Sequence, residues 1–179
     1  MIAASARLTA ADPRYDSAAR KLDLIQSGRA PRGSAIVLSP EEINAWVRVA
    51  VPQTVPDGVR QPRVDLGDGS ATGFALIDFL KLRQAKGSAT NWLIARLIDG
   101  ERPVEATAQV SASGGRCTVH VTRVAISSAE VSGTTLDLLI HTFLLPLFPD
   151  AKIDEPFELD YNIDRIDIRK TGVTVTIKK

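Results

Sequence analysis

Hydrophobic and polar residues alternate along much of the chain after residue 100, as expected for strands that bury one face. Alternation predicts strands over 103–112, from Cys117 onward, and over 157–159, 166–168 and 173–177. The parity of the apolar positions changes between Val121 and Val124, which predicts a β-bulge near Thr122–Arg123. Tight turns at 113–116 and 170–172 join successive strands and therefore indicate antiparallel pairing.

The first half of the chain carries helix signals. Ala18, Leu22 and Ile25 predict a short helix from Asp16 to about Gly28, followed by a loop and a short strand over 34–38. Ser39-Pro40-Glu41-Glu42 has the form of a capping box, which predicts a helix to about Ala50 that ends at Val51-Pro52. Pro52, Pro56, Gly58 and Pro62 then predict an extended connection with little regular structure.

These elements predict an α+β fold in which helices pack on one face of an antiparallel sheet. A chain of 179 residues is long enough for one hydrophobic core. We expect a loose N-terminal arm over residues 1–14 and a single domain over 15–179. Further helices are expected over 90–98 and 134–145.

The charge and the apolar segments of the sequence argue against two classes of protein, nucleic-acid-binding domains and proteins with a membrane-spanning helix. The 22 basic and 21 acidic residues are well mixed and give a net charge of +1, which is unlike a nucleic-acid-binding domain. No segment reaches the roughly 18–20 apolar residues that span a bilayer. The first residues do not form an intact signal peptide. Two alternatives follow, a cytoplasmic protein or one whose leader or anchor is missing from this sequence.

Catalytic motifs are missing from the sequence. Cys117 is the single cysteine and falls in a strand pattern, where a small buried residue is expected. His120 and His141 have neither a metal-ligand spacing nor a nucleophile elbow beside them. We therefore expect no enzyme activity, no cofactor and no metal, and the alternative is an active site assembled in space from scattered Ser, His and Asp residues.

The strand predicted over 71–82 becomes apolar on both faces from Phe74 to Leu82, so it should be covered on both sides. Asp78 lies inside this run, and a charge in a covered strand needs a partner. One interpretation is an ion pair or a hydrogen bond, with Lys81, Arg83 or Arg102 as partner. The other is a polar group that fixes the head group of a ligand.

The helix predicted over 134–145 is apolar almost all round, and such a helix lies in a core or faces another apolar surface. Three interpretations stay open: a core helix, an apolar groove between this helix and the 74–82 strand, and a contact with a protein or a membrane surface. The groove hypothesis assigns ligand binding to seven residues: Phe74, Leu76, Asp78, Leu80, Leu139, Phe143 and Leu147. The oligomeric state stays open.

From Ser39 onward, the order of elements resembles bacterial envelope proteins of the tubular lipid-binding type, and it also resembles uncharacterised bacterial proteins of this length. The resemblance rests on Leu38-Ser39-Pro40-Glu41-Glu42-Ile43-Asn44-Ala45, the hairpin through Phe74–Leu82, the long strand pair, the apolar helix, and the closing Pro156-Phe157-Glu158-Leu159 and Gly172-Val173-Thr174-Val175. It implies a strongly bent antiparallel sheet wrapped around helices, with an apolar interior for acyl chains. It also implies a periplasmic or membrane-anchored location. Binding of a lipid or another apolar molecule is therefore the expected function, and a structural or interaction protein with a solid core is the alternative.

Overall fold

In the computed structural model, residues 12–54, 58–79, 81, 100–141 and 152–179 are described. These residues form three helices and one nine-stranded antiparallel sheet. The helices are α1 (Pro13–Gln26), α2 (Pro40–Thr54) and α5 (Gly133–Leu139). The strands are β1 (Ala35–Leu38), β2 (Val59–Leu66), β3 (Ser70–Asp78), β4 (Glu101–Ser113), β5 (Arg116–Ile126), β6 (Ala129–Val131), β7 (Phe157–Glu158), β8 (Ile163–Arg169) and β9 (Gly172–Ile177).

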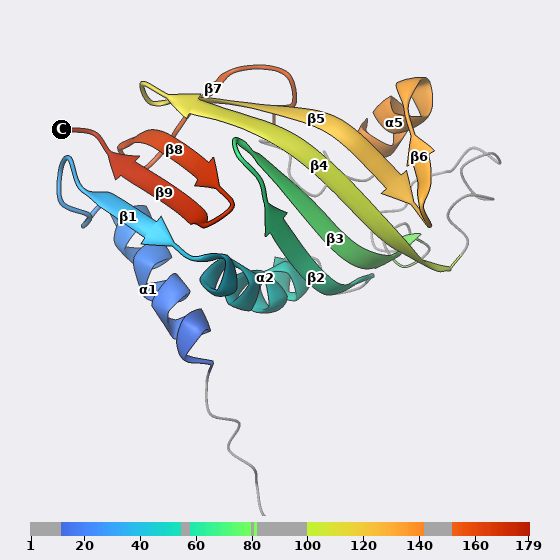
Figure 1. Ribbon diagram of the computed structural model, residues 1–179, viewed down its shortest axis with the longest axis horizontal. Coiled ribbons are helices and arrows are strands. Elements are labelled where there is room, and N and C mark those ends of the chain that lie inside the picture. The colour runs from blue at the N-terminus through green and yellow to red at the C-terminus, as the bar shows by residue number, and fades with distance from the viewer. Residues whose placement is uncertain (1–11, 55–57, 80, 82–99, 142–151) are drawn as a thin grey trace, which may run out of the picture.

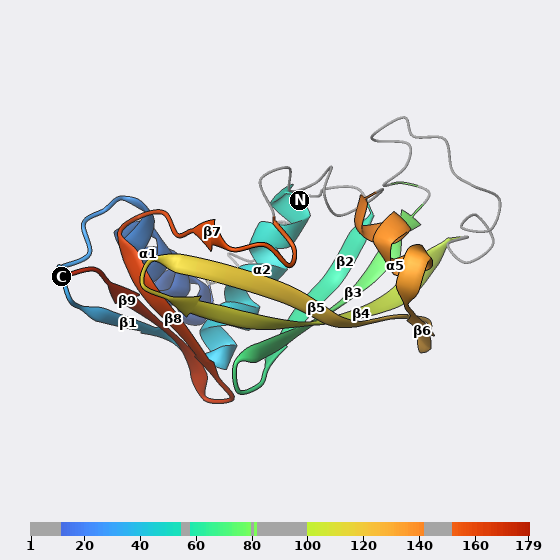
Figure 2. The same ribbon diagram turned by 90° about the horizontal axis from the view of Figure 1, so that it is seen from above.

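The strands follow the order β1-β9-β8-β4-β3-β2, and β5 pairs with β4, β6 and β7 (Figure 1). The sheet has two sections, a terminal section (β1, β8 and β9) and a long-strand section (β2 to β5). In the ladder between β4 and β8 they meet at one residue pair, Ala112 with Ile166. Figure 2 shows the two sections at an angle, with α1 and α2 between them. The fold is therefore a single α+β domain with a bent, unclosed antiparallel sheet, as expected.

The core of the described residues lies on the helix side of this sheet. In the terminal section, buried residues of α1, β1, β8 and β9 form the largest cluster: Ala18, Ile25, Ile36, Leu38, Ile163, Val175 and Ile177. A second cluster joins Phe79, Ile126 and Val131 to Leu136 and Leu139 of α5. Among the described helices, none is both long and apolar enough to cross a membrane.

Local sequence signals set the starts of the first two helices. Asp12 caps α1, because its Oδ1 accepts a hydrogen bond from the Arg14 amide at 3.0 Å, and Pro13 occupies the first helical position. The helix therefore begins three residues before the predicted Asp16 and takes in residues 13 and 14 of the expected arm; residues 1–11 lie outside the described part. The capping box is confirmed: the Ser39 Oγ accepts from the Glu42 amide at 3.2 Å, and Glu42 Oε2 accepts from the Ser39 amide at 2.8 Å.

Two predictions around the prolines were wrong. Helix α2 does not end at Val51-Pro52 but continues to Thr54 with Pro52 inside it. In this last turn the Thr54 hydroxyl donates to the Ala50 carbonyl at 3.1 Å. Pro52 has no amide to donate to the Arg48 carbonyl, and near the end of a helix this loss affects a single hydrogen bond. The connection expected to be irregular up to Pro62 instead becomes β2 at Val59. Pro62 is accommodated because β2 is an edge strand and its register shifts between Arg60 and Arg63.

The other strand predictions differ at their ends. The bulge near Thr122–Arg123 is confirmed, since Thr107 pairs with Arg123 and Ala108 pairs with Val121, leaving Thr122 as the extra residue. Strand β3 ends at Asp78, earlier than the predicted Leu82. The Asp78 Oδ1 accepts a hydrogen bond from the Lys81 amide at 3.2 Å, so the chain turns there. The helix predicted over 90–98 and the end of the one predicted over 134–145 lie outside the described residues.

Candidate functional site

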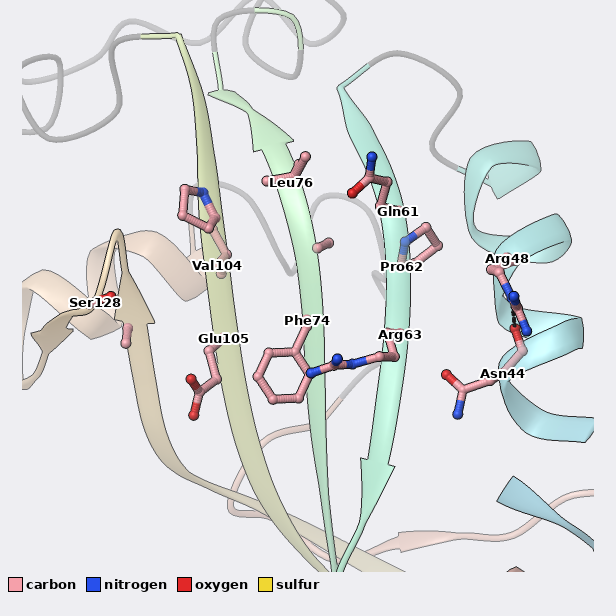
Figure 3. A pocket seen from close by; sticks show the side chains of 13 residues that line it. Asn44, Arg48, Gln61, Pro62, Arg63, Phe74, Leu76, Val104, Glu105 and Ser128 are labelled. Carbon is pink, nitrogen blue, oxygen red and sulfur yellow. Dashed lines mark hydrogen bonds between the residues drawn. The ribbon is translucent and has the colours of Figure 1, made fainter. Parts of the chain in front are cut away.

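A groove of about 650 Å³ lies over strands β2, β3 and β4 beside α2 (Figure 3). Its apolar lining residues are Pro62, Phe74, Ala75, Leu76, Pro103, Val104 and Ala125. Its polar and charged lining residues are Asn44, Arg48, Gln61, Arg63, Glu105 and Ser128. A volume of this size falls in the roughly 300–1,000 Å³ range of small-molecule sites.

Strand alternation decides which predicted residues share this groove. Phe74 and Leu76 line it, and side chains two apart in a strand point to the same face. Ile77 has the opposite parity and packs with Val59 and with the Phe79 cluster on the helix side. The strand is therefore apolar on both faces, as its sequence predicts. Ala75 and Val104 have the parity of Ile77 and pack with the same clusters, and they also line the groove.

The remaining predicted ligand-binding residues do not join Phe74 and Leu76. Leu139 packs against the second core cluster together with Ile77, and neither residue lines the groove. Asp78 lies at the end of β3, where its Oδ2 is 3.9 Å from the Lys81 ammonium. This is the structural partner that the sequence suggests. Leu80, Phe143 and Leu147 lie outside the described residues.

Arg63 and Phe74 form the centre of the groove. The guanidinium carbon of Arg63 lies 4.2 Å from the centroid of the Phe74 ring, in a cation–π contact between β2 and β3. The same guanidinium is 3.3 Å from the Asp65 carboxylate, and both of these side chains are more than half exposed. Figure 3 shows the Arg63 side chain extending from β2 across to the Phe74 ring.

The wall on the α2 side is fixed by Asn44. Its Nδ2 donates to the Val64 carbonyl at 2.7 Å and its Oδ1 accepts from the Val64 amide at 2.8 Å, so one side chain imitates a strand partner. This pair satisfies the backbone amide and carbonyl of Val64 on the edge strand β2 and holds the helix against it. One turn later, Arg48 Nε donates to the Asn44 carbonyl at 2.9 Å, which places Arg48 at the same rim.

The bulge in β2 shapes the same wall. Gln61 and Pro62 together stand opposite one residue of β3, and Gln61 has a left-handed φ of 50°. Such a bulge bends the strand and redirects neighbouring side chains. As a result, Arg60 pairs with Leu76 and Arg63 pairs with Phe74, so both arginines share the face of the groove.

The other candidate chemistry lies away from the groove. Cys117 is buried, and burial raises the pKa of its thiol, the opposite of a reactive cysteine. His120 Nδ1 contacts the Asp154 carboxylate on an exposed surface, and neither residue lines the groove. Among the residues that the structure describes, no group of three or more His, Cys, Asp and Glu side chains could hold a metal ion.

Several groove residues were missed by sequence reasoning. Arg48, Arg63 and Glu105 come from three separate elements, and each is ordinary within its own element. The Asn44 bridge likewise joins residues 20 positions apart. The sequence did hold one signal: Arg63 and Asp65 are two residues apart, which is the spacing of two side chains on one face of a strand. The proline at position 62 made this stretch look irregular.

In comparisons with family models, curated proteins and solved structures, no match to this chain was found.

Proposed function

We propose that this domain is a non-enzymatic binding protein for a lipid or another apolar ligand, and that the groove over β2–β4 is the binding site. The observation that carries the proposal is a groove of about 650 Å³ with Phe74 and Leu76 in its lining. On the same strand face as these two, the neighbouring positions toward the hairpin are polar, including the Thr72–Thr107 hydroxyl pair at 3.0 Å. The apolar surface on this face is therefore limited to the part of the sheet around Phe74 and Leu76.

The expected affinity for a short alkyl chain follows from its buried surface. Each fully buried methylene contributes about 0.8 kcal/mol. A groove covers a chain on one side, so an eight-carbon chain gains roughly half of the full amount, about 3 kcal/mol. That corresponds to a dissociation constant of roughly 6 mM, and longer chains bind more tightly.

Amide chemical shifts in ¹⁵N-labelled, delipidated protein measure binding in this range. We expect 1-octanol to shift the amides of β2, β3 and β4 that surround Phe74 and Leu76. Replacing Leu76→Ser should weaken 1-octanol binding about threefold or more, because a ligand methylene loses its apolar contact. The matched control is Val37→Ser on β1, an exposed valine (52 % accessible) remote from the groove.

The proposal fails if 1-octanol shifts no amides, or if it shifts only amides of residues that lie away from the groove. It also fails if Val37→Ser weakens binding as much as Leu76→Ser. Lipid that co-purifies with the protein, identified by mass spectrometry of an organic extract, would support it independently. Chemical shifts outside the groove report whether each variant keeps the fold.

A structural or interaction protein is the second candidate, and α5 is the observation that favours it. No described residue of α5 is buried, and Leu138 is 39 % exposed. A leucine on such a helix suits a contact with another protein. Light scattering after size exclusion tests this: a stable dimer that Leu138→Ser dissociates, together with an empty groove, would favour this candidate.

We also propose a cell-envelope location, periplasmic or membrane-anchored. The support is the resemblance of the element order to tubular lipid-binding envelope proteins. Fractionation of cells that express the protein from its native gene tests it. Recovery in the cytoplasmic fraction would contradict the proposal.

A further inference from the structure

We propose that the groove selects single-chain amphiphiles with an anionic head group, a carboxylate or a phosphate, and that Arg48 and Arg63 hold this head group. The inference rests on the proposed function and names the class of ligand. It starts from the charges of the groove. Among the residues that the structure describes, two arginines line it, against one carboxylate, that of Glu105.

Glu105 does not cancel the positive charge of the groove. Its carboxylate forms an ion pair with Arg123 of β5, so its charge is already matched from outside the lining. Arg123 also lies 3.6 Å from the Glu130 carboxylate, so two carboxylates share this guanidinium. Of the two lining arginines, Arg63 pairs with Asp65, which does not line the groove, and Arg48 is the one without a carboxylate partner among the described residues.

Arg48 has no carboxylate partner among the residues that the structure describes. Its Nε is used by the Asn44 carbonyl of its own helix, which fixes the stem and leaves the two terminal nitrogens for an incoming oxygen. Since a guanidinium presents its donors in a planar fork, it suits the two oxygens of a carboxylate or a phosphate. Arg48 lies at the rim, where a head group stays in contact with water.

Arg63 is held in position by two contacts, a cation–π contact and an ion pair. The Phe74 ring supports one face of the guanidinium, and Asp65 of the same strand pairs with its Nη2 at 3.3 Å. An exposed ion pair of this sort contributes only about 0–1 kcal/mol. A ligand head group can therefore replace Asp65 while the guanidinium stays on the ring, so little reorganisation is needed.

The positions of these side chains also orient the ligand. In Figure 3, Arg63 and Phe74 lie together, Arg48 lies on the α2 side, and Leu76 lies farther along β3. A head group on Arg63, with Arg48 on the α2 side of the groove, directs the alkyl chain along β3 toward Leu76 and Pro103, which both line the groove. The apolar and charged parts of the groove then match the two parts of an amphiphile.

The test compares octanoate and octyl phosphate with 1-octanol, by amide chemical shifts at low salt. Wild-type protein should bind each anion about threefold to tenfold more tightly than the alcohol, a ratio that salt reduces. Arg63→Gln and Arg48→Gln should each lower this anion-to-alcohol ratio. Asp65→Asn should raise it, because it frees Arg63 from its partner.

Arg60→Gln is the matched control. Arg60 lies on the same strand and the same face but pairs with Glu101 at 3.1 Å and does not line the groove, so its loss should leave the ratio unchanged. Equal affinity for octanoate and 1-octanol, or an equal effect of Arg60→Gln and Arg63→Gln, would overturn the head-group assignment while leaving an apolar site. Absence of binding by all three probes would instead overturn the proposed function.

A vesicle experiment separates a free amphiphile from a membrane lipid. The protein is floated with vesicles of phosphatidylcholine alone or with added phosphatidylglycerol. Binding of free octanoate without flotation supports the proposal. Flotation with the anionic vesicles and no binding of octanoate or octyl phosphate would overturn it in favour of a membrane-surface contact.

Discussion

Gly172, in the turn between β8 and β9, has a φ of +146°, and a Cβ built there lies 2.5 Å from the carbonyl oxygen of Leu38. Both the backbone conformation and the space therefore require glycine. Gly172→Ala should lower the free energy of unfolding by about 2–4 kcal/mol, measured by urea denaturation. Gly28→Ala is the control: Gly28 also has positive φ, but its Cβ meets no described atom within 4 Å, so about 1 kcal/mol is expected. Equal losses would contradict a close approach of β1 to this turn.

Cys117 gives a second prediction at this scale. It is 3 % exposed on β5, between Ala112 of β4 and Phe157 of β7, and burial raises the pKa of its thiol. Because the thiolate is the reactive form, native protein at pH 8 should not react with a disulfide reagent such as DTNB within minutes. One thiol per chain should react at once in denaturant. Rapid labelling of the native protein would show that β7 does not stay on β5.

Helices α1 and α2 are joined through Glu42, and this joint should make stability depend on pH. Burial opposes the ionisation of Glu42, but hydrogen bonds from Lys21, Ser17 and the Ser39 amide outweigh it and lower the pKa from 4.5 to about 2. A carboxyl whose pKa is lower in the folded state stabilises the fold above its unfolded pKa. This contribution is fully present above about pH 4.5 and disappears as the pH falls toward 2.

Glu42→Gln tests this joint. The side chain is 11 % exposed and pairs with Lys21 at 2.7 Å, so the variant should lose about 1–3 kcal/mol at pH 7. Its unfolding free energy should also fall less than that of wild type between pH 4.5 and 2, by urea denaturation at each pH. Glu41→Gln removes the neighbouring carboxylate, which is exposed and bonded to the Ser39 hydroxyl, and should have a smaller effect at pH 7. An unchanged pH profile in Glu42→Gln would contradict the assignment.

The same elements show how far the sequence could be read. The helix cap at Ser39, the hairpin turns and the bulge at Thr122 each depend on residues close together in the chain. The local sequence pattern was therefore enough to predict them. Pro52 and Pro62 misled the prediction because their cost depends on context: one lies in the last turn of a helix and the other in a bulged edge strand. At Pro62 the register shift of the edge strand accommodates the missing amide.

For the groove, the sequence could supply Phe74 and Leu76 but not their surroundings. Their apolar run predicted that both faces of the strand are covered. Which residues meet them depends on the register between β2 and β3 and on the Asn44–Val64 bridge. Neither is visible in the spacing of residue types. Leu139 was placed beside Phe74 because a helix and a strand were both apolar, whereas Leu139 packs against the Phe79 cluster and does not line the groove.

At the scale of the whole molecule, the two sections of the sheet have separate hydrophobic clusters. Whether the sections unfold together therefore depends on the strand that joins them, β4. This strand of 13 residues pairs with β3 and β5 along most of its length and reaches β8 through Ala112. A second link is the β2–β3 turn, where the Gly69 amide donates to the Ile168 carbonyl at 2.9 Å and the Gly69 carbonyl accepts from the Val110 amide at 2.9 Å. These links couple the sections through backbone hydrogen bonds.

We therefore expect one cooperative unit that contains both sections, with β6 and α5 as a less stable appendage. Ile177→Ala, in the largest cluster, should cost about 2–5 kcal/mol and speed hydrogen exchange in β3 and β4 as well as in β8 and β9. Val131→Ala should speed exchange mainly in β6 and α5, because β6 pairs with three residues of β5 and no described residue of α5 is buried. Mass spectrometry of exchanged peptides distinguishes the two patterns. If β3 and β4 kept their protection in Ile177→Ala, the two sections would unfold independently, and the groove would persist without the terminal section.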